Sequence, residues 1–191
     1  RAIVVYRKGY TLHDAYFEYL KIARQDENGS WQAFRPTNSC GTYDSCGFHP
    51  SLALDSQDNA HFVHYTVSGQ PKTKLSCTNR ELKHLSIELS ANPWIQRWDV
   101  PPYHRDHWSL LPIDAWDSLA VDSADKTHVS FYDTLEKHLK YSYDDGDPVT
   151  IDAGVHGGRC NAIAVDSGGN PWIIYHDDTN NGVKVARWMP E

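Results

Sequence analysis

The densest group of reactive side chains in this chain is one short polar segment, Tyr103-His104-Arg105-Asp106-His107-Trp108. Imidazole groups accept and donate protons near neutral pH, and a guanidinium binds a carboxylate through paired hydrogen bonds. An aromatic ring beside them offers a flat surface on which a ligand can stack. The segment therefore predicts Tyr103, His104, Arg105 and His107 as catalytic residues and Trp108 as a ligand contact.

Two other polar segments carry residues of the same kinds. One holds Tyr43 and His49, and the other holds His156 and Arg159, all of which we expect to contact a ligand. If the three segments meet, their His and Tyr groups could act as base and acid on a uronic acid, whose carboxylate Arg would neutralise.

The same imidazoles fit a second chemistry. Three or four of them would bind a divalent metal ion. The candidate ligands are His49, His104, His107 and His156. The simpler alternative is that these His are ordinary polar residues of loops.

A threefold internal repeat indicates which elements position these segments. Its copies are Ser51–His61, Ser118–His128 and Ala162–Trp172. Each copy has a run of small and branched residues, a polar turn that begins Asp-Ser, and a second run rich in aromatics. This pattern is typical of a β-hairpin repeated along a chain.

Residues that recur at one position of the repeat are expected to be structural. We expect the turn aspartates to accept hydrogen bonds from turn amides; these are Asp55, Asp122 and Asp166. His61 and His128 are predicted to bond across the hairpin turn, and His84 and His138 are expected to be equivalent to each other.

The remaining strands extend the repeat over the whole chain. Second and third strands are predicted at Ala2–Tyr6 and Leu20–Arg24, and fourth strands near Trp31–Arg35, Trp94–Val100 and Val149–Asp152. The predicted fold is all-β: one domain or segment over 1–191, a β-propeller or part of one, with four recognisable four-stranded blades. The blades cover about 1–37, 50–100, 117–152 and 161–188, the first and last being incomplete.

The pattern Ser-Leu-Ala-Val-Asp-Ser, followed by His-Val-Ser-Phe-Tyr-Asp and Leu-Lys-Tyr-Ser, resembles the blade repeat of secreted bacterial β-propellers. It is similar to the NHL type and to the sialidase-like BNR type. The resemblance implies a propeller whose blade-to-blade connections gather near the axis on one face, where propellers bind ligands. The three reactive segments are such connections. The Asp-Ser turn resembles the sialidase Asp-box, although Ser167-Gly-Gly-Asn-Pro-Trp172 lacks its Asp and shifts its Trp.

Composition limits the function classes. The net charge is −7 with acidic and basic residues interspersed, so no basic stripe for nucleic acid is present and no nucleic-acid partner is expected. No apolar run approaches the length of a membrane span. Cys40 and Cys46 are predicted to form a local disulfide, although a metal site of Cys40, Cys46 and His49 is an alternative. The cysteines, together with a start at Arg1 that indicates processing or truncation, favour an extracellular or periplasmic protein.

Two classes of function remain open from the sequence. The first is an extracellular binding module or assembly subunit that recognises a glycan or a protein partner, with another chain or copy completing the propeller. The second is a polysaccharide lyase or hydrolase, or a metal-dependent enzyme, that uses the His-rich face.

Overall fold

The computed structural model describes residues 2–12, 15–34, 45–68, 79–88, 95–97, 104–107, 116–133, 136–154 and 157–188. All regular elements in these ranges are β-strands, which form four small antiparallel sheets. Within the described ranges, no helix is long and apolar enough to cross a membrane.

The sheets follow one another along the chain. The first contains β1 (Ile3–Leu12), β2 (Ala15–Gln25) and β3 (Trp31–Phe34). The second contains β4 (Ser45–Leu54), β5 (Ala60–Ser68), β6 (Asn79–Glu88) and β7 (Ile95–Arg97), with β8 (His104–His107) also paired to β6. The third contains β9 (Asp117–Val121), β10 (Thr127–Asp133), β11 (His138–Tyr143) and β12 (Val149–Asp152). The fourth contains β13 (Gly157–Val165), β14 (Pro171–Asp177) and β15 (Gly182–Arg187).

The predicted repeat is confirmed as three equivalent hairpins. In each, the backbone N–H of the turn aspartate donates to the carbonyl four residues later: Asp55 to Asn59, Asp122 to Lys126 and Asp166 to Asn170, at 2.9–3.1 Å. The fourth turn residue has a positive φ, 61° at Asp58, 60° at Asp125 and 78° at Gly169. Asp and Gly tolerate this left-handed conformation, which β-branched residues resist.

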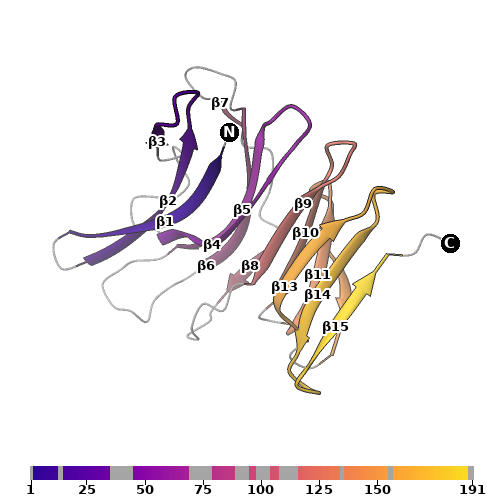
Figure 1. The fold of residues 1–191 in the computed structure, drawn as a ribbon. Coiled ribbons are helices and arrows are strands. Elements are labelled where there is room, and N and C mark those ends of the chain that lie inside the picture. The colour runs from indigo at the N-terminus through magenta and orange to yellow at the C-terminus, as the bar shows by residue number, and fades with distance from the viewer. Residues whose placement is uncertain are drawn as a thin grey trace.

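Neighbouring sheets pack face to face in chain order, as Figure 1 shows. Alternate residues of β5 serve both interfaces: Phe62 packs toward Leu20 and Ile22 of the first sheet, and Val63 packs toward the third sheet. A separate cluster joins the third and fourth sheets. Successive strand residues point to opposite faces, so a sheet that is buried on both faces carries apolar residues at consecutive positions.

Repeated serines add a polar link between the sheets. The hydroxyl oxygen of Ser51 accepts a hydrogen bond from the N–H of Leu119 at 2.9 Å. The hydroxyl oxygen of Ser118 accepts one from Ile163 at 3.1 Å. The first strand of each hairpin is therefore bonded to the first strand of the next, so β4, β9 and β13 lie next to one another along the row. The described sheets do not close into a ring, and the first and fourth lie at opposite ends of the row (Figure 1).

The buried clusters should dominate stability. Phe131 is fully buried between the second and third sheets. We expect Phe131→Ala to lower the free energy of unfolding by about 3–5 kcal/mol, because it removes apolar contacts and leaves a cavity. Urea denaturation followed by tryptophan fluorescence measures this loss. The control is Val183→Ala, since Val183 is 68% exposed; equal losses for the two variants would contradict this account of the core.

Candidate functional site

The two ends of the sheets differ in chemistry. The end that carries the turns of Asp55, Asp122 and Asp166 lies at the top of Figure 1, and we call it the turn end. The opposite end carries the β14–β15 turn, the end of β10 and the starts of β9, β11 and β13, and we call it the connection end.

At the turn end, each repeat aspartate holds its turn and one ring. Oδ1 of Asp122 accepts the N–H groups of Ala124 and Lys126 at 2.8 and 2.9 Å, and its Oδ2 lies 3.2 Å from Nε2 of His128. Burial raises the pKa of Asp122, but these hydrogen bonds outweigh it and hold the pKa below its ordinary value. The same pattern joins Asp55 to His61 and Asp166 to Trp172. The structural role predicted for His61 and His128 is confirmed.

The equivalence predicted for His84 and His138 is wrong. His84 pairs with Val63 in β5, and Tyr141 pairs with Ser130, the matching residue of β10. Tyr141 therefore takes the place of His84, whereas His138 begins β11. Both His residues stand in the sequence Lys-His-Leu, but equivalence in the repeat follows from strand register, which is set by the hairpin turn.

A pocket of about 460 Å³ opens at the turn end between the third and fourth sheets. This volume is within the range of small-molecule sites. The described residues that line the pocket come from β10, β11, β12, the start of β14, the β11–β12 and β13–β14 turns, and the segment after β15. They are His128, Tyr141, Tyr143, Asp147, Val149, Gly169, Asn170, Pro171 and Trp188.

Aromatic rings dominate this pocket. His128 and Tyr141 are buried, whereas Tyr143 and Trp188 are 47% and 57% exposed at its rim. The Tyr143 ring meets the His128 ring edge-on, with centroids 5.0 Å apart. Exposed rings beside a concavity suit the apolar faces of a sugar ring.

The polar groups of the pocket form an ordered chain. The Tyr141 hydroxyl lies 2.8 Å from Nδ1 of His128, whose Nε2 faces Asp122. Burial raises the pKa of Tyr141 to about 12, so its hydroxyl keeps its proton and can donate it to Nδ1. With that donation, a single ring hydrogen on Nε2 satisfies both contacts of His128. Among the described lining residues, Asp147 is the one carboxylate.

The predicted catalytic segment forms an edge strand. β8 pairs with β6, with His104 opposite Leu82 and His107 opposite Asn79, on the side of β6 away from β5. His49 belongs to β4, which is three strand positions away, about 14 Å at 4.8 Å per strand. The backbone thus places His49 and His104 in one sheet at opposite edges and does not bring them together. Tyr43, Tyr103, Trp108 and His156 lie outside the described residues, so the roles given to this set stay predictions.

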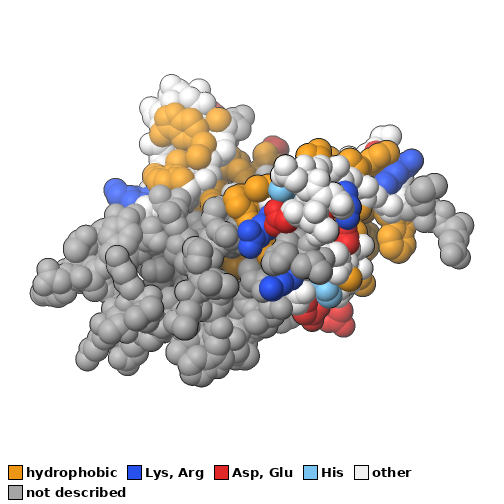
Figure 2. All heavy atoms as spheres, turned by 90° about the horizontal axis from the view of Figure 1, so that it is seen from below, with side chains coloured by type: hydrophobic (Ala, Val, Ile, Leu, Met, Phe, Trp, Pro, Cys, Tyr) orange, Lys and Arg blue, Asp and Glu red, His pale blue; other side chains and the backbone are white. Residues whose placement is uncertain are grey.

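Arg159 lies in a described cluster at the connection end. Its guanidinium carbon is 5.7 Å from the centre of the Tyr132 ring, and its Nε is 3.7 Å from Asp178, which also accepts from His176 at 2.7 Å. Burial raises the pKa of Tyr132, and the nearby Arg159 opposes that rise. Figure 2 shows this end, with basic, acidic and His side chains gathered on its described surface.

Ion pairs reinforce the same end. Lys184 bridges Asp152 and Asp177 at 3.1 and 3.0 Å, and Lys140 pairs with Asp133 at 2.8 Å. Hydrogen bonds from Asn180 and Lys184 lower the pKa of Asp177 to about 2.

One buried group at this end was missed by sequence reasoning. Asp117 begins β9, and both of its carboxyl oxygens are shielded from solvent and accept no hydrogen bond. Burial raises its pKa well above the ordinary value. The only sequence signal was its place at the end of a reactive connection.

Cysteine and metal predictions stay open. Cys40 lies outside the described residues, so the Cys40–Cys46 disulfide stays a prediction, and Cys160 is a free, exposed thiol. Within the described ranges, no three His, Cys, Asp or Glu side chains form a group that could hold a metal ion.

Comparisons with known proteins inform the fold. No family model and no curated protein matches this chain. The structure is similar to that of the Hadza microbial sialidase Hz136, with a TM-score of 0.52 and 9% sequence identity. The match covers 90% of this chain and 38% of the sialidase chain, so this chain spans well under half of that protein's length. At this identity the likeness shows the fold alone, a row of antiparallel sheets like that of a sialidase-type β-propeller.

The turn aspartate should be essential to the pocket wall. We expect Asp122→Ala to destabilise the protein by about 2–4 kcal/mol, because two turn amides and the His128 ring lose an ionised acceptor. Thermal or urea unfolding at pH 7 tests this. Asp147→Ala, in an exposed part of the same sheet, is the control, and a loss for Asp122→Ala no larger than for this control would contradict the role given to the turn.

Proposed function

We propose that this chain is a carbohydrate-binding β-propeller module, exported from the cell, and that its turn-end pocket binds a neutral sugar. The observation that carries this proposal is the pocket of about 460 Å³ with two exposed aromatic rings at its rim. The likeness to a sialidase fold supports a carbohydrate-related role. Another chain or copy that extends the row of sheets fits the same proposal.

The charge of the pocket supports a neutral ligand. Asp147 is acidic, and no Lys or Arg is found among the described lining residues. A sugar carboxylate beside Asp147 would be repelled. The hydroxyl groups of a neutral sugar can instead donate to Asp147 and to the side-chain oxygen of Asn170.

The alternative function is a lyase or hydrolase that acts on an acidic sugar at the connection end. Two observations favour it: the partly exposed guanidinium of Arg159 beside Tyr132, and the buried carboxyl of Asp117. Arg159 would bind the sugar carboxylate. This function would use the opposite end of the sheets, so variants of the pocket would leave it unchanged.

A substitution at the pocket rim tests the binding proposal. We expect Trp188→Ala to raise the Kd of the tightest-binding neutral oligosaccharide at least about tenfold, because a stacking surface is lost. A panel of glucose-, galactose- and mannose-based oligosaccharides identifies that ligand, and calorimetry measures the Kd.

The chain offers a matched control in Trp31, which is 51% exposed on the first sheet. Trp31→Ala should leave the Kd unchanged. Sialylated and uronate-containing oligosaccharides should bind more weakly than neutral ones of equal length. The proposal is overturned if no neutral glycan binds, or if both Trp variants weaken binding equally.

A further inference from the structure

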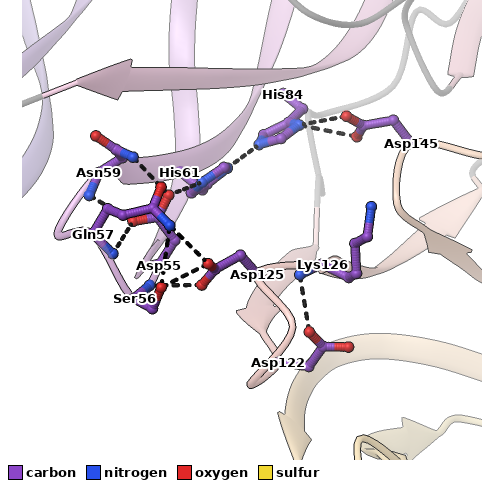
Figure 3. Close-up of polar contacts among 10 residues, drawn as sticks. All are labelled: Asp55, Ser56, Gln57, Asn59, His61, His84, Asp122, Asp125, Lys126 and Asp145. Carbon is purple, nitrogen blue, oxygen red and sulfur yellow. Dashed lines mark hydrogen bonds and ion pairs between the residues drawn. The ribbon is translucent and has the colours of Figure 1, made fainter.

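A chain of four titratable side chains crosses from the second sheet to the third. Oδ2 of Asp55 lies 3.2 Å from Nε2 of His61, and Nδ1 of His61 lies 3.2 Å from Nε2 of His84. Nδ1 of His84 lies 2.9 Å from Oδ1 of Asp145, which belongs to the β11–β12 turn of the third sheet. Figure 3 shows the four groups in line.

Counting hydrogens gives the charge that this row of four side chains needs for all three contacts to be hydrogen bonds. An ionised carboxylate only accepts, so Nε2 of His61 and Nδ1 of His84 must each carry a hydrogen. The contact between the two rings needs a third hydrogen, on either ring. Two neutral imidazoles supply two hydrogens, so the three contacts require one imidazolium shared by the pair.

The carboxylates at the two ends of this row of side chains, Asp55 and Asp145, are suited to accept these hydrogens. Burial raises the pKa of Asp55, but hydrogen bonds from Asn59, His61 and Gln57 outweigh it and keep the pKa below its ordinary value. The side chains of His61 and His84 are 14% and 3% exposed, so water cannot replace the contacts at low cost.

The other sheets provide an internal comparison. In the third sheet, Tyr141 occupies the position of His84 and donates its own hydrogen to His128, so that version is complete with a neutral imidazole. In the fourth sheet the ring that faces Asp166 belongs to Trp172, which does not titrate in this way. Among the described sheets, the His61–His84 row is the one whose hydrogen bonds need one proton more than two neutral imidazoles carry.

We propose that the His61–His84 pair holds one shared proton and acts as a pH-sensitive clasp between the second and third sheets. A second proton would place N–H groups face to face across the 3.2 Å contact and break it. Loss of the shared proton would remove one of the three hydrogen bonds. The clasp is thus complete with one proton and incomplete with two or none.

Among the described residues, the other charges near the clasp are paired. The Asp125 carboxylate accepts from Ser56 and Gln57, which joins the two hairpin turns directly. Lys126, on the same turn of the third sheet, pairs with Asp144 at 2.6 Å. The described charges that face the imidazoles are Asp55 and Asp145.

The sign of the pH dependence follows from proton counts. In the unfolded chain both imidazoles titrate near pH 6.5. Below that pH the unfolded state holds two protons and the folded pair one, so stability rises with pH. Above it the unfolded state holds none and the folded pair still holds one, so stability falls with pH. The contribution of the pair peaks near neutrality, and each limb changes the unfolding equilibrium constant by up to about tenfold per pH unit.

Two measurements on the full chain test the clasp. Nitrogen-15 spectra of the histidine side chains at pH 7 should show that His61 and His84 together carry one positive charge. The same spectra should show a neutral His128. Urea unfolding from pH 5 to 8 should show the peak for the wild type, and His84→Tyr should remove it, because this variant copies the third sheet. Val183→Ala is the control and should keep the peak, because Val183 is exposed and contacts none of these rings.

Two results would contradict the shared proton. Two neutral rings at pH 7, or parallel pH profiles for wild type and His84→Tyr, would overturn the clasp. If His84→Tyr does not fold, Asp145→Asn replaces it. Asp145→Asn removes one carboxylate that favours the cation, so the upper limb should move to lower pH, and an unmoved limb would overturn the proposal.

Discussion

The hydrogen bonds of the turn aspartate are the interaction on which the rest of the structure depends. One carboxylate oxygen closes the hairpin by accepting two turn amides, and the other binds a ring N–H on the second strand. This arrangement fixes the register of the first two strands, and the register decides which side chains face each neighbouring sheet. A single residue type therefore controls both the local turn and the sheet-to-sheet packing.

The residues at the positions of His61 and His84 differ between the sheets, and they change the polar contacts in each space between neighbouring sheets. With His61 and His84 the space holds a polar chain that Asp145 ends from the next sheet. With His128 and Tyr141 the polar chain is complete within one sheet, and the pocket opens beside it. The repeated residues thus determine the hairpins and their packing, and the residues that differ between copies determine which polar groups face each space.

The sequence predicts the hairpins well because turn chemistry and strand alternation are local properties. The Asp-Ser turns and the strands that flank them follow from residue type alone. The place of β8 does not, because an edge strand is chosen by long-range pairing with β6, which no local pattern encodes. The error over His138 has the same origin, since letters that match along the chain need not match across the sheet.

The pocket was missed for a related reason. The sequence search favoured residues that break the repeat in the connections, yet Tyr141 and His128 lie within repeated strands. Their value comes from three-dimensional neighbours: the β13–β14 turn and Trp188 form the opposite wall. The connection end gathers cations and acids that pair largely with one another, whereas the turn-end pocket leaves aromatic surface beside one carboxylate among its described lining residues, Asp147. Ion pairs satisfy their own charges, but exposed rings at a concavity gain free energy by covering apolar area. That difference is the reason we propose the turn end, and not the connection end, as the binding surface.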